Sequence, residues 1–297
     1  MSMGVCRLCN RQEELKESHI VPKLIFRWLK ITSATKYLRF GNEINRREQD
    51  GLKLYWLCND CEKKFSKMET YFSNTIFRPL RHQDQVVYNN NFLKFAVSLS
   101  WRVLKYFQEL GGLDKFDRKI INASAQALLS WENFLFDREK NPSKYEQHFY
   151  NFIGQLEPGH SNIPVNIHRY LQRSVEIDVM SNSNIAFVYT KLPGLLLIGY
   201  INLSDSKPWR NTRICVHNGR IMSMKYNFPT ELWQIIKQKA NNAQQLQNSI
   251  SKKQQEKINK DFSKNIQEAK KSETIHTLCK DINVFGIDLV YPHLTKK

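Results

Sequence analysis

The chain has 297 residues, of which 41% are hydrophobic and 25% are charged, and this composition is typical of a folded soluble protein. Its longest apolar stretch, residues 195–201, is far shorter than the roughly 18 to 20 residues that a membrane helix needs. The net charge of +17 predicts a polyanionic partner. We expect nucleic acid, with an anionic membrane surface or an acidic protein as alternatives. The N-terminus lacks the regions of a signal peptide, so the expected compartment is the cytoplasm.

Two CxxC pairs near the N-terminus, Cys6/Cys9 and Cys58/Cys61, carry the most specific pattern in the chain. Each pair can turn two thiolates toward one ion, and two pairs complete a tetrahedral zinc site. Such a site has no open position, so a zinc ion there would be structural. The alternative is a redox-active CxxC, which usually occurs once in a chain. Zinc is therefore the expected cofactor.

The segment around these cysteines, residues 1–80, predicts one small zinc-stapled module. Residues 22–30 favour a helix that opens at a proline and has one apolar face. Residues 32–50 are polar and loop-rich, and residues 52–57 are typical of a strand entering the second CxxC pair. Residues 62–77 then place apolar side chains at helical spacing. This order of elements predicts a compact strand–helix unit.

The next part of the chain, residues 81–160, predicts a helical segment. Residues 92–106 carry an apolar stripe at positions i, i+3, i+4 and i+7, and further helices are expected at about 124–136 and 142–153. We interpret the many aromatic residues here as core packing.

The last part, residues 161–297, begins with period-two patterns that predict an antiparallel sheet, at residues 174–180, 185–190 and 194–203. Asn218-Gly219 between two apolar runs predicts a type I′ hairpin turn. A long helix is expected from Pro229, and residues 237–271 are rich in Lys, Gln and Asn. They are typical of an exposed helix, a partner-binding arm or a partly disordered tail. The predicted fold class is therefore α+β.

Three motifs together resemble a known family: Cys6-x-x-Cys9, His19-Ile20-Val21-Pro22, and Leu57-Cys58-x-x-Cys61 followed by a helix. They are similar to the HNH endonucleases, also called His-Me finger or ββα-metal nucleases, and most of all to members stabilised by a four-cysteine zinc. The resemblance covers residues 6–77 only. It implies phosphodiester hydrolysis with a structural zinc and a separate catalytic Mg²⁺ or Mn²⁺.

The resemblance assigns His19 as the general base that takes a proton from water, a task that suits the imidazole of histidine at neutral pH. Glu62 stands where the family has a metal ligand, and Glu69 and Glu17 are further candidate ligands. The family's histidine-orienting Asn has no clear equivalent; Asp50 is preferred over Asn45 and Asn42 because it directly precedes the strand leading to Cys58. Ser18 replaces the usual metal ligand before the histidine. The alternative for His19 is a histidine that only bonds locally.

Basic residues cluster around this candidate site and predict a track for phosphates. They are Lys23, Arg27, Lys30, Arg46, Arg47, Lys63, Lys64 and Lys67. The leading hypothesis is a metal-dependent DNA endonuclease, by analogy in bacterial or phage genome defence. A second hypothesis is a catalytically inactive, zinc-stabilised nucleic-acid-binding or protein-assembly module. In a third, residues 81–297 bind a protein partner and residues 237–271 form the binding arm.

Overall fold

The computed structural model describes residues 2–154, 163–182, 184–205, 207–222 and 228–291. Its strands are β1 (Ser2–Val5), β2 (Gln12–His19), β3 (Lys53–Cys58), β4 (Gln85–Asn89), β5 (Gln147–Asn151), β6 (Glu176–Ser181), β7 (Ile185–Leu192), β8 (Leu195–Leu203) and β9 (Asn218–Met222).

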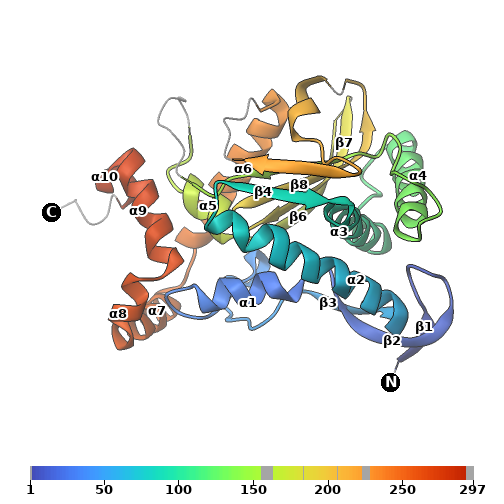
Figure 1. Cartoon of the computed structure of the whole chain (residues 1–297). Coiled ribbons are helices and arrows are strands. Elements are labelled where there is room, and N and C mark those ends of the chain that lie inside the picture. The colour runs from blue at the N-terminus through green and yellow to red at the C-terminus, as the bar shows by residue number, and fades with distance from the viewer. Residues whose placement is uncertain (1, 155–162, 183, 206, 223–227, 292–297) are drawn as a thin grey trace.

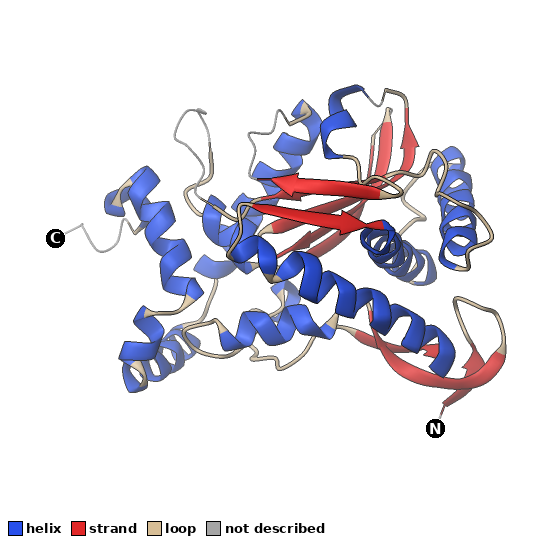
Figure 2. Ribbon diagram, viewed as in Figure 1, coloured by secondary structure: helices blue, strands red, loops and turns tan. Residues whose placement is uncertain are grey.

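Helices surround these strands and make the fold a mixed α+β architecture, as predicted (Figures 1 and 2). The α-helices are α1 (Lys23–Ile31), α2 (Asn59–Tyr71), α3 (Asn90–Glu109), α4 (Arg118–Leu135), α5 (Ile167–Arg173), α6 (Thr230–Asn248), α7 (Lys252–Lys264), α8 (Ile266–Lys270), α9 (Glu273–Phe285) and α10 (Ile287–Val290). Short turns of other pitch are η1 (Gly41–Glu43), η2 (Phe72–Phe77), η3 (Pro79–Arg81) and η4 (Lys207–Thr212). None of the helices in the described part of the chain has the length and apolarity needed to cross a membrane.

The central sheet is antiparallel with strand order β5-β8-β7-β6, and both of its faces are covered. One core lies between the sheet and helices α3 and α4. A second core on the other face includes side chains of α5 and α6. Residues along β8 alternate between the two cores: Leu195 and Leu197 join the first, whereas Leu196 and Ile198 join the second. Burial on both faces explains why this strand is a continuous apolar run.

The N-terminal module is a three-stranded antiparallel sheet, β1-β2-β3, with α1 and α2 beside it. The apolar face expected on the helix after the second CxxC pair is confirmed, because Phe65, Met68 and Ile76 are buried. The module shares its core with the rest of the protein: Trp101 of α3 packs edge-on against Trp56 at 6.4 Å and against Phe65 at 6.1 Å. Helix α3 therefore packs against the N-terminal module and supports it.

The C-terminal helices fold back along the molecule. The predicted basic segment, residues 237–271, comprises most of α6, then α7 and α8. Asp281 of α9 is fully buried and accepts hydrogen bonds from His168 and Arg169 of α5. Near the N-terminal module, Asp261 of α7 pairs with Arg47, and the backbone N–H of Glu273 donates to the carbonyl of Thr32. These contacts join α7–α9 to both the sheet and the module.

Two predicted elements are wrong. Residues 142–153 do not form a helix; they contain β5, whose neighbouring side chains Phe149 and Tyr150 enter opposite cores. Burial on both faces hid the period-two pattern. Asn218-Gly219 is not a hairpin turn either, because both residues lie in β9, which pairs with β4. Glycine is needed here for space: a Cβ at Gly219 would lie 2.1 Å from the Tyr88 ring.

The three-part division of the chain stays a prediction, and its boundary at residues 160/161 lies outside the described residues. The second and third parts nevertheless share one sheet, because β5 pairs with β8.

Candidate metal centre and the adjoining histidine site

The antiparallel pair of β2 and β3 carries both candidate sites, one at each end. We call this pair the β2–β3 hairpin, although residues 20–52, which include α1, connect its strands. The strands are antiparallel, with Leu15 opposite Cys58 at one end and His19 opposite Lys53 at the other. The first CxxC pair precedes β2, and the second closes β3 and opens α2. The strand pairing therefore separates the cysteines from the histidine while holding both on one rigid element.

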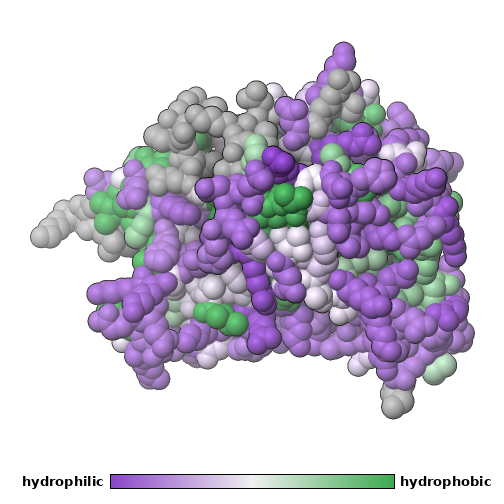
Figure 3. Space-filling view, in the orientation of Figure 1, coloured by the Kyte–Doolittle hydropathy of each residue, from purple (hydrophilic) through white to green (hydrophobic). Residues whose placement is uncertain are grey.

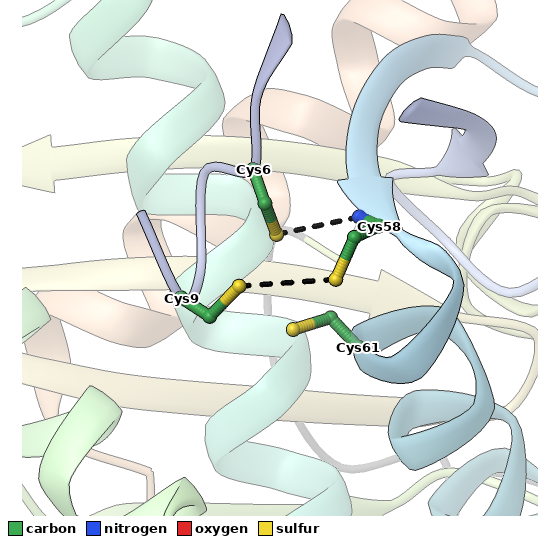
Figure 4. A group of neighbouring side chains, drawn as sticks. All are labelled: Cys6, Cys9, Cys58 and Cys61. Carbon is green, nitrogen blue, oxygen red and sulfur yellow. Dashed lines mark hydrogen bonds between the residues drawn. The ribbon is translucent and has the colours of Figure 1, made fainter. Parts of the chain in front are cut away.

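The four cysteines converge on one point (Figure 4). Their sulfur atoms all lie within 4.8 Å of one another, and Cys9 Sγ lies 3.8 Å from Cys58 Sγ. A tetrahedral zinc with Zn–S bonds of about 2.3 Å separates its sulfur ligands by about 3.8 Å. The spacing and the donor set therefore fit a four-cysteine zinc site, as the sequence predicts.

Hydrogen bonds around the sulfurs support thiolates. The backbone N–H of Cys58 donates to Cys6 Sγ at 3.3 Å, and Arg11 Nε donates to Cys9 Sγ at 3.4 Å. A hydrogen bond from the Cys61 thiol lowers the pKa of Cys6 to about 4, whereas the same bond and burial raise the pKa of Cys61. Four thiolates this close repel one another, so a divalent cation is what allows them to ionise together.

At the other end of the hairpin, His19 contacts Asp50. The distance from His19 Nε2 to Asp50 Oδ1 is 3.0 Å, and the two side chains are 15% and 28% exposed. Burial alone would raise the pKa of Asp50, but the hydrogen bond from the backbone N–H of Gly51, with His19, lowers it. An ionised carboxylate only accepts hydrogen bonds, so in this contact Nε2 of His19 is the donor, and in the neutral ring Nδ1 is then the nitrogen with the lone pair.

Glu62 lies on the first turn of α2, with its carboxylate near both Ser18 and His19. Burial raises the pKa of Glu62, while a hydrogen bond from Ser18 and the charge of Arg102 act in the opposite direction. Ser18 is buried, and its Oγ lies 3.3 Å from the carbonyl oxygen of Lys16. Glu62 is a half-buried carboxylate that forms no ion pair with any described residue.

Arg102 is the side chain that the sequence reasoning missed. It is 3% exposed, and its Nη1 contacts Glu69 Oε1 at 2.7 Å and the carbonyl of His19 at 3.0 Å. Its Nη2 is buried and has no hydrogen-bond partner among the described residues. The sequence held a signal for it, since Arg102 is the single charged residue within the run Ser98–Leu104, which α3 buries throughout.

The carboxylates predicted to bind a catalytic metal do not converge. Glu69 is paired with Arg102, and Glu17 points to Lys53, whose Nζ lies 2.7 Å away. Within the described ranges, only the four cysteines bring three or more His, Cys, Asp or Glu ligand atoms within 4.8 Å of one another. Glu62 is therefore the acid of this end that is left for a cation, and no preformed protein cage surrounds it.

The predicted phosphate-binding residues fall into three groups. Lys63, Lys64 and Lys67 line an open groove of about 690 Å³ beside α2, together with Lys94 of α3. On α1, Lys23 and Arg27 are exposed, and Lys30 donates to the carbonyl of Gln49. Arg46 and Arg47 form ion pairs, with Glu43 and Glu48 and with Asp261 respectively. The basic residues of the predicted track that form no ion pair with described residues and are exposed are Lys63 and Lys67 in the groove and Lys23 and Arg27 on α1; Lys94 is paired with Asp137.

Comparison of the chain with models of protein families, with curated proteins and with solved structures finds no match to any of them.

Proposed function

We propose that this protein is a metal-dependent endonuclease that hydrolyses phosphodiester bonds in DNA, with its chemistry at the His19 end of the hairpin. The observation that carries the proposal is the contact between His19 and Asp50, which leaves Nδ1 of His19 free to take a proton. The four-cysteine centre at the other end of the same strands would fix the hairpin. By analogy with the family that residues 6–77 resemble, the proposed role is in bacterial or phage genome defence.

His19 would act as general base. With Nε2–H bound to the ionised Asp50, Nδ1 can accept the proton of an attacking water, and Asp50 then stabilises the imidazolium that forms. Arg102 donates a hydrogen bond to the carbonyl of His19, and β2 is hydrogen-bonded to β3. The backbone that carries the His19 ring is therefore rigid. Asp50 is thus a positioning residue, and His19 is the catalytic one.

Glu62 would hold the divalent cation. Mg²⁺ commonly takes only one or two carboxylates from the protein and completes its coordination shell with substrate phosphate and water. A single carboxylate, that of Glu62, is therefore enough protein ligand for Mg²⁺. When bound there, the cation would neutralise charge that develops on the scissile phosphate. Lys63 and Lys67, exposed on the same helix, would bind phosphates next to the cleaved bond.

The test is nicking of supercoiled plasmid at low salt, with Mg²⁺ and with Mn²⁺, by the wild type and by His19→Ala. General-base catalysis contributes about 10²- to 10⁴-fold, so His19→Ala should lose at least about 10²-fold in rate while keeping its zinc. His82→Ala, at an exposed histidine of the same chain, is the control and should nick like the wild type. Nicking by His19→Ala at the wild-type rate would refute the assignment.

A second proposed function is a zinc-stabilised nucleic-acid-binding or assembly module without catalysis. The ion pair of Glu69 with Arg102 favours it, because that pair puts a guanidinium where a metal ligand would be needed. Such a module would bind one zinc per chain and show no Mn²⁺ binding that depends on Glu62. Electron paramagnetic resonance titration of Mn²⁺ with the wild type and Glu62→Gln separates the two functions.

A further inference from the structure

A two-stranded antiparallel ribbon, β4 with β9, lies outside the central sheet and next to α3 and η2 (Figures 1 and 2). Its register pairs Gln85 with Met222, Val87 with Arg220 and Asn89 with Asn218. These six side chains share one face, because neighbouring residues in a strand point to opposite sides. All six are exposed, so the ribbon presents a complete outer face to solvent.

The inner face of the ribbon is anchored to the body of the protein. Val86, Tyr88 and Ile221 are buried, and the Tyr88 ring packs edge-on against Phe92 of α3 at 5.0 Å. The hydroxyl of Tyr88 accepts a hydrogen bond from the backbone N–H of Cys215 at 3.1 Å. The outer face is therefore carried on a firm support, which a surface for specific recognition needs.

The outer face carries a particular set of side chains. Gln85, Asn218 and Arg220 form no side-chain hydrogen bond or ion pair with any described residue, unlike Asn89, whose side chain caps α3. Val87 is 58% exposed and Met222 is 47% exposed. The ribbon has no acidic residue in either strand. It thus offers two free amides, a free guanidinium and two apolar groups on one surface.

Two grooves with basic side chains meet the end of the ribbon where Asn89 pairs with Asn218. One holds Lys63, Lys64, Lys67 and Lys94 and reaches Asn91, just after β4. The other, of about 510 Å³, is lined by Lys140, Arg213 and His217 and ends at Asn218 of β9. Figure 3 shows a small hydrophobic spot over the ribbon with hydrophilic surface to either side. A polyanion at this end of the ribbon would meet Lys63, Lys67 and Lys140, which form no ion pair with described residues, whereas Lys94 is paired with Asp137 and Arg213 with Glu146.

We propose that the β4–β9 ribbon inserts into the major groove of B-form duplex DNA and reads its base edges. A groove about 12 Å wide admits a two-stranded ribbon, and five residues extend it over roughly 16 Å. Arg220 has the fork that pairs with guanine, Gln85 and Asn218 have the amides that pair with adenine, and Val87 and Met222 can contact thymine methyl groups. The lysines at the Asn89–Asn218 end of the ribbon would bind backbone phosphates.

This geometry distinguishes duplex DNA from duplex RNA. The major groove of A-form RNA is deep and narrow, and side chains cannot read it. The inference rests on the proposed action on DNA, and it names sequence-specific duplex as the substrate class, but it does not depend on cleavage. Binding can therefore be measured without added Mg²⁺ or Mn²⁺.

The experiment selects bound sequences from a pool of random 20-base-pair duplexes with the zinc-loaded full chain, then measures affinities by fluorescence anisotropy at fixed salt. We expect the wild type to enrich a sequence that contains a guanine at a fixed position. Arg220→Ala should show no preference for that guanine and should bind the enriched sequence roughly 5- to 150-fold more weakly. Arg220→Lys keeps the charge without the fork and should lose the same guanine preference with a smaller loss of affinity. Gln85→Ala should relax the preference at a neighbouring adenine.

The matched control is Arg118→Ala, which removes an exposed arginine without a described partner from the start of α4. It should keep the sequence preference, with affinity within about twofold of the wild type. Equal behaviour of Arg220→Ala and Arg118→Ala would overturn the proposal, as would equal binding of duplex RNA or tighter binding of single-stranded DNA. Sequence-specific binding without nicking would support base reading by the ribbon and refute the proposed nuclease activity. Nicking with no effect of Arg220→Ala on sequence preference would support the nuclease activity and refute base reading by the ribbon.

Discussion

The two ends of the β2–β3 hairpin show two different ways of arranging ligand-type side chains. At one end four sulfurs converge within 4.8 Å of one another, a spacing that fits a tetrahedral zinc site. At the other end each of three acids has found its own basic or histidine partner: Asp50 with His19, Glu69 with Arg102, and Glu17 with Lys53. The first end thus has the donor set of a metal site, whereas at the second the side chains pair with one another and Glu62 has no ion-pair partner among the described residues.

The largest effect should come from breaking the cysteine end. Cys61→Ser removes one thiolate from the tetrahedral site, so we expect loss of zinc and a free energy of unfolding lowered by at least roughly 3 kcal/mol, since a structural zinc contributes folding energy directly. Zinc content by mass spectrometry and urea unfolding measure both. Cys279→Ser, at an exposed cysteine, is the matched control. Full zinc content and unchanged unfolding in Cys61→Ser would contradict the comparison.

At the histidine end, the next largest effect should come from Glu69→Gln. The variant leaves Arg102 buried without its carboxylate, a change that costs about 3 kcal/mol in buried pairs. Urea unfolding should show this loss with zinc retained, which sets it apart from Cys61→Ser. The control Glu14→Gln removes an exposed partner of Lys16 and should leave unfolding unchanged. If both variants unfold alike, the pair with Arg102 does not hold this end together.

A smaller effect should separate the ligands from their surroundings at the cysteine end. Arg11 contacts Cys9 Sγ at 3.4 Å and offsets the negative charge of four thiolates. Arg11→Ala should weaken zinc binding on the order of tenfold, the usual effect of losing a hydrogen bond to a ligand. Competition with a chromogenic chelator measures the affinity. Arg7→Ala removes the same charge between Cys6 and Cys9, from a side chain paired with Glu109, and should change affinity less. Equal losses in the two variants would show that the charge, and not the hydrogen bond to Cys9, supports zinc binding.

The smallest effect should have the opposite sign. Because burial raises the pKa of Glu62, the folded chain holds this proton more tightly than the unfolded chain, and stability falls as pH rises above the usual glutamate pKa. Glu62→Gln removes that penalty. The variant should match the wild type in acid and become slightly more stable than it as pH rises toward neutrality, while losing metal-dependent nicking. Urea unfolding across this pH range checks it, and a variant that is less stable at neutral pH would contradict the burial argument.

Local patterns in the sequence predicted much of this comparison. The two CxxC pairs predicted the cysteine cluster, and the position of Asp50 before β3 predicted a partner for His19 that the structure does place within 3.0 Å. The register of β2 and β3 holds these residues near one another, because each of them lies in or close to one of the two strands. The catalytic roles of His19, Asp50 and Glu62 stay predictions.

What the sequence could not supply depends on contacts between distant segments. Arg102 comes from a helix more than eighty residues after His19, and only the packing of α3 on the hairpin brings them together. The β5 strand was read as a helix because both of its faces are buried, and Gly219 was read as a turn because the approach of Tyr88 is a tertiary contact. In each case the residue is explained by a contact with a segment distant in the sequence.

The most direct test of the account concerns which nitrogen of His19 carries the proton. Two-bond ¹H–¹⁵N correlation spectra of zinc-loaded protein, compared with His19→Ala for assignment, report the tautomer of the neutral ring. We predict protonation at Nε2 with Nδ1 free, and loss of this preference in Asp50→Ala, because the ionised Asp50 can only accept a hydrogen bond. A neutral ring protonated at Nδ1 in the wild type would leave no lone pair where the proposed base needs it and would contradict the account.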